Sequence, residues 1–476
     1  MRFGASDARG TMGVMGFLRA HKVEVGIFVL ALLVRLFYFG LSLEVNNGNI
    51  TNTVAAADGY FTVSQNLIDG HGLSSDATPP YTPYSFRPPL FHFFIAGAYA
   101  LFGSYWGVIF LQIVLASLLP LLGMRLAGYF IENRRILIAL GIFLALEPSS
   151  ILYSVFLYSE IFFTLWLYAA IWALFAYLKK DQSRYLALSA FLLGLATLTR
   201  PTTEYVPVVM GAVLLWNHRG SIFSRKILVD VGVYAAVFLL TIAPWVYRNY
   251  VVFGVAGISP QTGVNLYTQL LPTVYSIERG TTFQEEYKAL IAAGVHGPNE
   301  ADITEGRKDT AIAVPLLLDH PKGLTLSILN SGWNFFVLDG TFNFLRHIQI
   351  RPEEMIGKPS LVALFSDPAA VSAYILRNLN SPVIFSILLA RAMWVSITIL
   401  FLLGVWRYGK SRGMSSHATV ALLIVLYFAA TSLLSGFGLT ARYRLPVNVF
   451  IITFAFYEIA AIAPRLFQKV KRLHAS

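Results

Sequence analysis

Residues 106–129 read WGVIFLQIVLASLLPLLGMRLAGY, and Arg125 is the one charged residue in this run. About 20 mainly apolar residues are enough for a helix to cross the hydrocarbon core of a membrane. We therefore predict an all-α integral membrane protein with about ten transmembrane helices. The other predicted spans are 24–43, 136–156, 160–178, 185–199, 203–217, 228–246, 382–406, 417–435 and 446–463.

The composition supports a membrane protein and excludes several other classes. Of the 476 residues, 56% are hydrophobic and only 13% are charged, whereas soluble domains carry about 25% charged residues. There is no cysteine, so disulfides and thiolate chemistry are excluded. No phosphate-binding loop and no Gly-x-Ser-x-Gly motif occur, so nucleotide-driven pumping and serine hydrolysis lack support. The histidines are scattered, without the spacing of metal ligands.

The net charge of +11 comes from basic residues beside the apolar runs, where they set orientation. With both termini in the cytoplasm, every predicted inner segment is basic, as the positive-inside rule requires. The expected location is the plasma (inner) membrane, with the active site on the external side. Two outer segments are long, 45–105 and 247–381. The predicted parts are a catalytic membrane module (1–246), an external, mainly helical domain (247–381), and C-terminal membrane helices with a basic cytoplasmic tail (382–476). Apolar spacing predicts helices within 305–330.

The first outer segment holds the first candidate site residues. Asp58 precedes a predicted amphipathic helix that lies on the membrane surface and ends at Gly70. Arg87 precedes two prolines and the apolar stretch 90–102, which we also place at the interface. Asp58 is either a functional acid or a helix cap, and Arg87 either binds a phosphate or is an interfacial arginine with its charge at the surface.

Further charges lie near the predicted outer ends of the spans. Glu160 begins an apolar run, where an acid is costly unless it is paired, lines a cavity or meets a helix dipole. The short spans 185–199 and 203–217 meet at Arg200, and such a break borders a cavity or is a tight loop. Four arginines contradict the positive-inside rule, so each binds an anionic ligand or pairs with Glu160, Glu204 or Asp58. These are Arg200, Arg248, Arg442 and Arg444.

Several stretches, taken in order, resemble the bacterial polyprenyl-phosphate-sugar glycosyltransferases of the GT-C superfamily, which include protein O-mannosyltransferases and lipid A aminoarabinose transferases. The resemblance covers about residues 25–460. The motifs are Asp58-Gly59-Tyr60, Asn66-Leu67-Ile68-Asp69-Gly70-His71-Gly72, Arg87-Pro88-Pro89, Leu157-Tyr158-Ser159-Glu160, Gly194-Leu195-Ala196-Thr197-Leu198-Thr199-Arg200-Pro201, Pro244-Trp245-Val246-Tyr247-Arg248-Asn249-Tyr250 and Arg442-Tyr443-Arg444-Leu445-Pro446.

The resemblance implies roles for three residues. Asp58 matches an essential acid of the first external loop, Glu160 matches a second acid, and Arg87 matches a cation that contacts the carrier phosphate. The chain departs from many relatives by having Asp58-Gly59 instead of paired acids, and Phe86 where some have an acid. If a divalent metal such as Mg²⁺ or Mn²⁺ is used, Asp58 and Glu160 would hold it.

The resulting hypothesis is an inverting transfer of a sugar from a polyprenyl phosphate to an envelope lipid, glycan or protein on the outer face of the membrane. Asp58 would act as general base on the acceptor hydroxyl or position it. Glu160, the second residue assigned to catalysis, would either bind sugar hydroxyls or, with Asp58, hold a divalent cation. Carrier-phosphate contacts are assigned to Arg87, Arg248, Arg442 and Arg444, and substrate contacts to Tyr60, Tyr84, Arg200 and Glu204.

Two alternatives stay open at this point. A transporter or lipid flippase would also carry intramembrane charges and broken spans, but the sequence shows no internal repeat. An oligosaccharide polymerase or ligase would use a pyrophosphate-linked donor and release a polyprenyl diphosphate. Release of the monophosphate, or movement of substrate without a new glycosidic bond, separates these readings.

Overall fold

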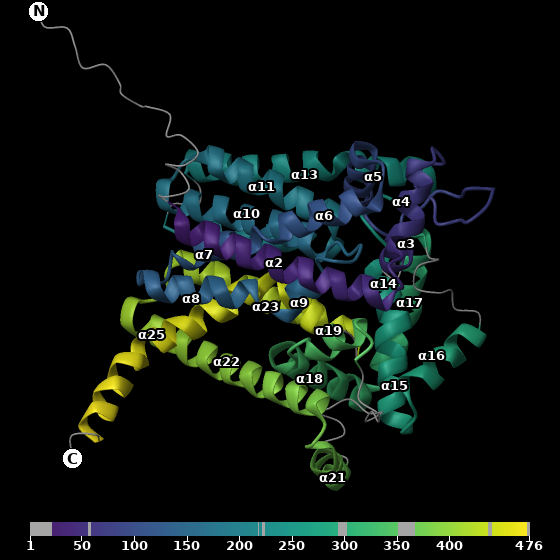
Figure 1. Ribbon diagram of the computed structural model, residues 1–476. Coiled ribbons are helices and arrows are strands. Elements are labelled where there is room, and N and C mark those ends of the chain that lie inside the picture. Colours follow the sequence, from purple (N-terminus) through teal and green to yellow (C-terminus); the bar gives the residue numbers. More distant parts are fainter. Residues whose placement is uncertain are drawn as a thin grey trace, which may run out of the picture.

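The computed structural model describes residues 21–55, 59–217, 219–220, 224–293, 302–350, 367–436 and 440–473. Over these residues the chain is all-α, with helices joined by turns and short 3₁₀ or π segments and with no strand (Figure 1). The predicted fold class is therefore confirmed. The first half contains α2 (Lys22–Val45), α3 (Ile50–Ala55), α4 (Tyr60–Ile68), α5 (Leu90–Phe102), α6 (Tyr105–Ala116), α7 (Leu119–Ala127), α8 (Arg134–Ala145), α9 (Pro148–Leu152), α10 (Glu160–Lys180), α11 (Ser183–Thr199), η1 (Pro201–Thr203), α12 (Val206–Asn217) and α13 (Arg225–Phe253).

The second half begins with a group of shorter helices and ends with three long ones. Its elements are α14 (Gln261–Asn265), η2 (Leu266–Leu270), α15 (Leu271–Arg279), α16 (Phe283–Ala292), α17 (Ile303–Leu318), α18 (Pro321–Val337), α19 (Thr341–His347), α21 (Pro368–Asn378), α22 (Pro382–Arg412), α23 (Ser416–Ser432), η3 (Leu433–Ser435), α24 (Thr440–Arg444), η4 (Leu445–Val447) and α25 (Asn448–Leu473). The helices expected within 305–330 are present as α17 and α18.

Six helical segments of the described chain are long and apolar enough to cross a membrane, and a seventh is possible if the bent pair α17–α18 counts as one span. The six are Lys22–Val45, Tyr105–Ala127, Glu160–Lys180, Arg225–Phe253, Pro382–Arg412 and Ala441–Ala463. Helices α11 and α23 are apolar but shorter. The total of about ten spans therefore stays a prediction.

The predicted span 136–156 is wrong as a single helix. Helix α8 ends at Ala145, and a new short helix, α9, begins at Pro148. Proline lacks an amide hydrogen and disfavours helical backbone in the residue before it. Glu147 accordingly has an extended conformation, with φ −65° and ψ 121°. Its carboxylate accepts a hydrogen bond from the Ser150 amide and so caps α9.

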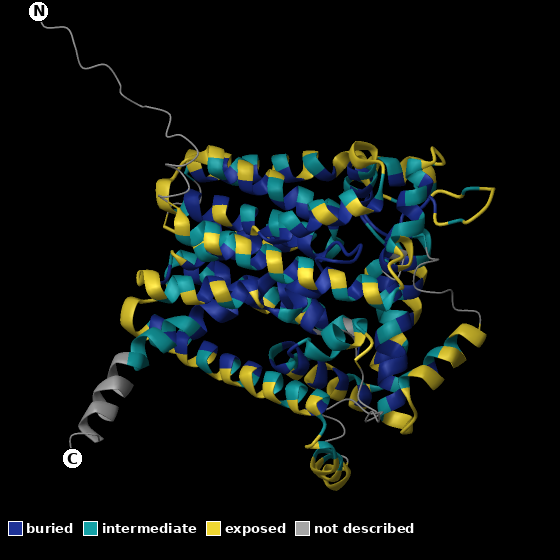
Figure 2. Cartoon of the chain, in the orientation of Figure 1, coloured by how far each residue is buried: buried dark blue, intermediate teal, exposed yellow. Residues whose placement is uncertain are grey.

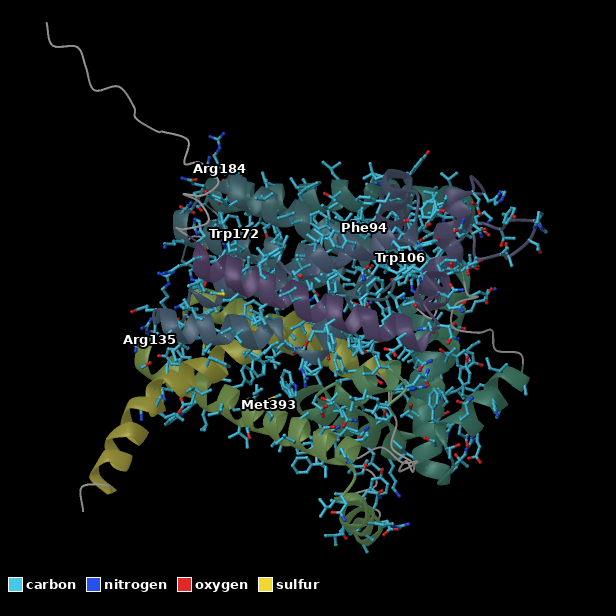
Figure 3. The ribbon with its side chains drawn as sticks, in the orientation of Figure 1. Phe94, Trp106, Arg135, Trp172, Arg184 and Met393 are labelled. Atoms are coloured by element: carbon cyan, nitrogen blue, oxygen red, sulfur yellow. The ribbon has the colours of Figure 1, made fainter. Side chains whose placement is uncertain are left out.

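The helices run alongside one another, and their basic termini meet at one end of the bundle (Figures 1 and 3). At this end Lys226 pairs with Asp181, and Arg412 pairs with Glu132, which ties α10 to α13 and α22 to the loop before α8. We call this the basic end. Helix α2 begins there and α25 ends there. The opposite end carries α3, α4, α14 and the start of α10, and we call it the site end.

Burial differs strongly between helices. Helix α10 lies well inside the bundle, with 67% of its apolar window buried, whereas only 17% of the apolar window of α22 is buried (Figure 2). Exposed leucines and phenylalanines on a membrane helix face lipid rather than water. The central position of α10 fixes the depth and direction of Glu160, its first residue.

The predicted division of the chain into 1–246, 247–381 and 382–476 stays a prediction, and one of its boundaries lies within a helix. Helix α13 continues without a break to Phe253, so the predicted boundary at 246/247 falls inside it. Helices α17 and α18 are bent by 105° relative to each other, and together they are long and apolar enough to form one membrane span. At this bend, Glu278 of α15 accepts hydrogen bonds from His320 Nδ1 at 2.6 Å and from the Gly323 amide at 2.8 Å, and Pro321 begins α18.

Candidate functional site

Four segments far apart in the sequence meet at the site end around Glu160. They are the start of α4, the Ser159–Glu160 start of α10, Arg200 after α11, and Arg442 in α24. The carboxylate of Glu160 is 1% exposed. Its Oε1 atom accepts hydrogen bonds from Arg200 Nη1 at 2.6 Å and from Arg442 Nε. The three ions together carry a charge of +1.

Local sequence explains why Arg200 points at Glu160. Arg200 precedes Pro201, so its backbone leaves the helical region and is extended, with φ −144° and ψ 130°. Helix α11 ends at Thr199 for this reason, and Arg200 Nη1 reaches across to α10. The break at Thr199-Arg200-Pro201 thus brings a cation to the site, as expected for a broken span that borders a polar site.

The second oxygen of Glu160 differs from the first. Oε2 is buried and makes no hydrogen bond within the part of the chain that the structure describes. A buried carboxylate oxygen without a donor is uncommon in native structures, where most buried polar atoms are paired. This oxygen is available to accept a hydrogen bond from a ligand hydroxyl or a water molecule.

Tyr60 links the first outer loop to this cluster. Its hydroxyl and Ser159 Oγ are 2.8 Å apart, and Ser159 Oγ also accepts from Arg200 Nη1 at 3.1 Å. The guanidinium carbon of Arg87 lies 4.6 Å from the centre of the Tyr60 ring, which is a cation–π contact. Arg87, Tyr60 and Arg200 are therefore neighbours, as the hypothesis of one shared site requires.

The loop before Arg87 is held by residues that come much later in the chain. Tyr84 O accepts from Arg248 Nη1 at 2.9 Å, and Phe86 O accepts from Ser259 Oγ at 2.6 Å. Between them, Ser85 Oγ accepts from the Ile303 amide at 2.9 Å. The position of Arg87 thus depends on α13 and on the segment that follows it. Arg248 contributes to the site by binding the backbone carbonyl of Tyr84, and its guanidinium also lies over the Trp245 ring.

His92 is a site residue that the sequence analysis missed. It is fully buried in α5, its Nδ1 lies 3.1 Å from Ser64 Oγ, and its ring centre lies 5.1 Å from that of Tyr60. Burial, with a smaller contribution from the charge of Arg87, lowers the pKa of His92 to about 3. The imidazole is therefore neutral at physiological pH. A polar residue inside the apolar stretch 90–102 was the available signal.

Some of the predicted site residues lie away from the Glu160 cluster or outside the described residues. Asp58 lies outside the described residues, directly before Gly59 and Tyr60. Tyr84 is buried, and its ring contacts His92. Arg444 is fully buried: it donates to Phe335 O, Leu338 O and Asn448 Oδ1 and stacks over Trp394. The phosphate-binding role of Arg444 stays a prediction, but this geometry favours a structural role.

A cavity of about 170 Å³ adjoins the cluster. Glu204 lines it, and burial raises the pKa of that carboxyl. Amides and hydroxyls also face the cavity, among them Gln261, Asn265 and Tyr443. A carboxylate with amides, hydroxyls and tyrosine rings offers both hydrogen-bond partners and flat apolar surfaces, which suits a hydroxyl-rich ligand.

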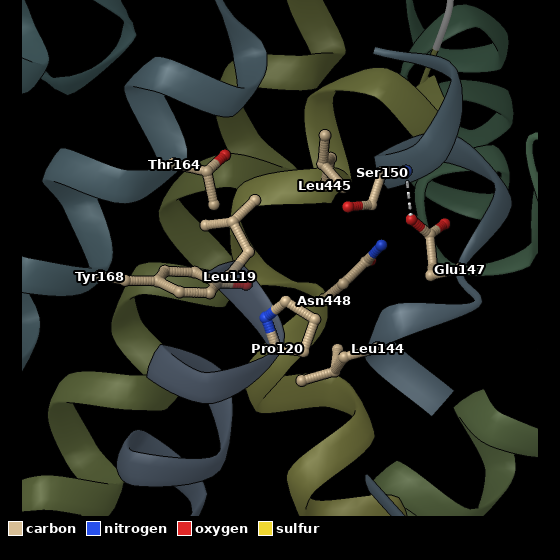
Figure 4. A pocket seen from close by; sticks show the side chains of 9 residues that line it. All are labelled: Leu119, Pro120, Leu144, Glu147, Ser150, Thr164, Tyr168, Leu445 and Asn448. Carbon is tan, nitrogen blue, oxygen red and sulfur yellow. Dashed lines mark hydrogen bonds between the residues drawn. The ribbon is translucent and has the colours of Figure 1, made fainter. Parts of the chain in front are cut away.

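Glu147 is a second buried acid, and its hydrogen bonds indicate a structural role. Glu147 accepts from the Ser150 amide at 2.6 Å (Figure 4). Ser150 Oγ in turn accepts from Arg35 Nη2 at 2.7 Å. Beside them is a cavity of about 20 Å³, lined also by Tyr168 and Asn448. This is room for one water molecule. None of the site arginines Arg87, Arg200 and Arg442 lines it.

A divalent metal does not fit the described part of the site. No group of three or more His, Cys, Asp or Glu side chains able to hold a metal ion occurs among the described residues. Oε1 of Glu160 is already shared by two guanidinium groups, whose positive charge disfavours a second cation. The metal role of Asp58 and Glu160 stays a prediction, and no step below depends on it.

Comparison with solved structures finds similar chains at low sequence identity, among them three structures. Two are of the oligosaccharyltransferase from Archaeoglobus fulgidus: AglB in complex with an inhibitory peptide and a dolichol-phosphate (14% identity, 97% of this chain, TM-score 0.47) and the apo form (14% identity, 94%, TM-score 0.48). The chain spans 52% of each of these proteins. The third is ArnT from Cupriavidus metallidurans bound to undecaprenyl phosphate (16% identity, 93% of this chain, 81% of that one, TM-score 0.38).

Comparison with curated protein sequences finds no match. A family model, described as dolichyl-phosphate-mannose-protein mannosyltransferase, matches residues 86–247. This stretch is about a third of the chain, and it contains Arg87, Glu160, Arg200 and Glu204. Over these residues the chain is similar to this glycosyltransferase family, which confirms there the resemblance drawn from the sequence.

Proposed function

We propose that this protein is an inverting glycosyltransferase that moves a sugar from a polyprenyl phosphate to an envelope lipid, glycan or protein. The observation that carries the proposal is the cluster in which Glu160 holds Arg200 and Arg442, with Arg87 next to Tyr60. The cluster is net positive and at the site end. The match of residues 86–247 to a mannosyltransferase family supports the same reading.

The reaction needs fixed positive charge at the leaving group. The acceptor hydroxyl oxygen forms a bond to the anomeric carbon while the bond from that carbon to the phosphate oxygen breaks. The acceptor proton passes to Asp58, and both electrons of the broken bond stay on the polyprenyl phosphate. Attack from the face opposite the leaving group inverts the configuration. Cations that stabilise the growing phosphate charge lower the barrier most when they are already in place.

The described residues supply such cations. Arg87 is the first candidate for the phosphate, because its loop is fixed by hydrogen bonds to Tyr84 O, Ser85 Oγ and Phe86 O. Arg200 and Arg442 are oriented by Glu160, which therefore acts as a positioning residue rather than a base. The cavity beside Glu204 is proposed to hold the hydroxyl-rich part of a substrate.

The site is proposed to face the outside of the cell. Its support is the separation of the site end from the basic end, which the positive-inside rule assigns to the cytoplasm (Figure 1). A donor that is anchored in the membrane by its polyprenyl chain also accounts for the absence of a nucleotide-binding motif from the sequence.

The test is single-turnover transfer by purified protein in detergent, with a panel of radiolabelled polyprenyl-phosphate sugars and envelope acceptors. Wild type should form a labelled glycoside of inverted configuration and release polyprenyl monophosphate. Asp58→Asn should abolish transfer while the donor still binds. Arg87→Ala should lower the rate by about 10²-fold.

Asp69→Asn is the matched control for Asp58→Asn. Asp69 is exposed directly after α4, and within the described part of the chain its carboxylate accepts a hydrogen bond from Gln65 alone. This variant should transfer at the wild-type rate. Full activity of Asp58→Asn would reject the base. Release of a diphosphate would favour the polymerase or ligase, and movement of labelled lipid without a new glycosidic bond would favour a transporter.

A further inference from the structure

A cavity of about 540 Å³ lies at the basic end, away from the candidate site. Helices α2, α7 and α8 form its walls, with Phe28, Leu118, Leu121 and Leu137 among the apolar lining residues. Ligand cavities in proteins range from about 300 to 1,000 Å³, so this one is large enough for part of a lipid. None of the residues of the proposed transfer site lines it.

Three charged side chains line this otherwise apolar cavity. Arg125 and Arg134 line it, both are exposed, and neither makes a hydrogen bond or ion pair with the described part of the chain. Glu24 lines it as well, and its Oε2 atom is buried without a hydrogen-bond partner among the described residues. Elsewhere at the basic end, Lys226 and Arg412 do find acidic partners. The three charged side chains give this cavity a net charge of +1.

The cavity is elongated along the helices that line it. Its lining extends along α2 from Val23 to Phe28, and along the α7 region from Arg125 back to Leu118. Seven residues of helix correspond to about 10 Å along the axis. The charged groups are thus at the helix ends, at headgroup level, and the apolar lining continues roughly 10 Å towards the middle of the bundle.

We propose that this cavity, defined by Glu24, Arg125 and Arg134 with its apolar walls, binds one anionic glycerophospholipid. The two guanidinium groups bind the phosphate, one acyl chain lies along Phe28 and Leu118, and Glu24 Oε2 accepts a hydrogen bond from a headgroup hydroxyl. Basic pockets between membrane helices at the cytoplasmic surface are suited to such headgroups.

Charge complementarity selects this occupant. A phosphatidylglycerol headgroup carries one negative charge, which neutralises the net +1 of the cavity, and its hydroxyls supply the donor for Glu24. A zwitterionic headgroup such as phosphatidylethanolamine leaves the net charge in place. An arginine that merely reaches the membrane surface needs no cavity beside it, whereas both arginines here line the same one.

The test is native mass spectrometry of the full-length protein, titrated in detergent with phosphatidylglycerol, phosphatidylethanolamine or polyprenyl phosphate. Phosphatidylglycerol should bind most tightly, and Arg125→Ala and Arg134→Ala should each weaken that binding by about fivefold. The matched control is Arg135→Ala, which removes the same charge from the adjacent, exposed residue of α8 that does not line the cavity. It should change the affinity by less than about twofold.

A second pair of variants tests the apolar part without changing charge. Leu118→Trp should fill the cavity and weaken lipid binding, whereas Leu146→Trp places the same side chain at an exposed leucine outside it and should not. Three results would overturn the proposal: equal losses in Arg134→Ala and Arg135→Ala, tighter binding of polyprenyl phosphate than of phosphatidylglycerol, or binding that appears only after removal of residues 1–20.

Discussion

The arginines at the site end differ in what their guanidinium groups contact. Arg200 and Arg442 share the carboxylate of Glu160, and Arg87 lies over the Tyr60 ring. Arg444 instead satisfies two backbone carbonyls and an amide oxygen in the protein interior. Arg442 and Arg444 are two residues apart in one motif, so sequence spacing alone could not separate a site cation from a structural one.

This difference predicts that replacement by lysine mainly lowers stability at Arg444 and mainly lowers the transfer rate at Arg442. Arg444→Lys loses the planar fork and the stacking on Trp394, so we expect a loss of about 3 kcal/mol in the free energy of unfolding. Arg442→Lys keeps a cation beside Glu160, so it should cost about 1 kcal/mol of stability but lower the transfer rate. Denaturant unfolding and single-turnover transfer, measured on both variants, check this. A stable but inactive Arg444→Lys would instead return Arg444 to the phosphate site.

Much of the site could be anticipated from residue type and order, but its contacts could not. An acid at the start of an apolar run and arginines that contradict the positive-inside rule were visible in the sequence, and Arg200 and Arg442 do pair with Glu160. His92 was missed, because a single histidine in an apolar stretch is compatible with either burial or function. The support of the Arg87 loop by Ser259 and Ile303 is long-range, and no local pattern encodes it.

At the level of helices, the sequence predicted the break at Arg200 but not the breaks at Pro148 and between α17 and α18. The helices expected within 305–330 are present, yet hydropathy did not reveal their 105° bend, where Glu278 of α15 contacts His320. The interval 136–156 has the composition of a span, but Pro148 divides it. Proline was visible in the sequence; whether it kinks or ends a helix depends on the packing around it.

The bend between α17 and α18 should weaken in acid. Hydrogen bonds from His320 and then from the Gly323 amide lower the pKa of Glu278. A carboxyl whose pKa is lower in the folded chain stabilises the fold above its unfolded-state pKa, and that stabilisation is lost as pH falls through the lowered value. Between about pH 6 and pH 3, the unfolding temperature should therefore fall more steeply for wild type than for Glu278→Gln.

Glu44→Gln is the matched control for this measurement. Glu44 is exposed near the end of α2, and its carboxylate makes no ion pair with the described residues. Its replacement should leave the pH dependence of unfolding unchanged. Parallel curves for wild type and Glu278→Gln would show that the contacts of Glu278 do not hold the bend.

For the molecule as a whole, we expect the site end to be accessible from outside the cell and the basic end to be accessible only from the cytoplasm. The chain has no cysteine, so single cysteines can be introduced without background labelling. Ser75 and Arg184 are exposed, the first in the loop between α4 and α5, the second at the basic end (Figure 3). A membrane-impermeant maleimide should label Ser75→Cys in intact cells, and Arg184→Cys only after lysis. The reverse pattern would place the candidate site on the cytoplasmic side.

The support of the Arg87 loop also sets an order of events during synthesis. Ser85 and its partner Ile303 are 218 residues apart in the chain. At about 5–20 residues per second, the ribosome needs roughly 10 to 40 s to make the intervening segment. Throughout that interval Ser85 lacks the amide that holds it, although the helices on either side are already inserted. We therefore expect the proposed sugar transfer to begin only after translation has passed residue 303, and a stalled, shorter nascent chain to lack this activity.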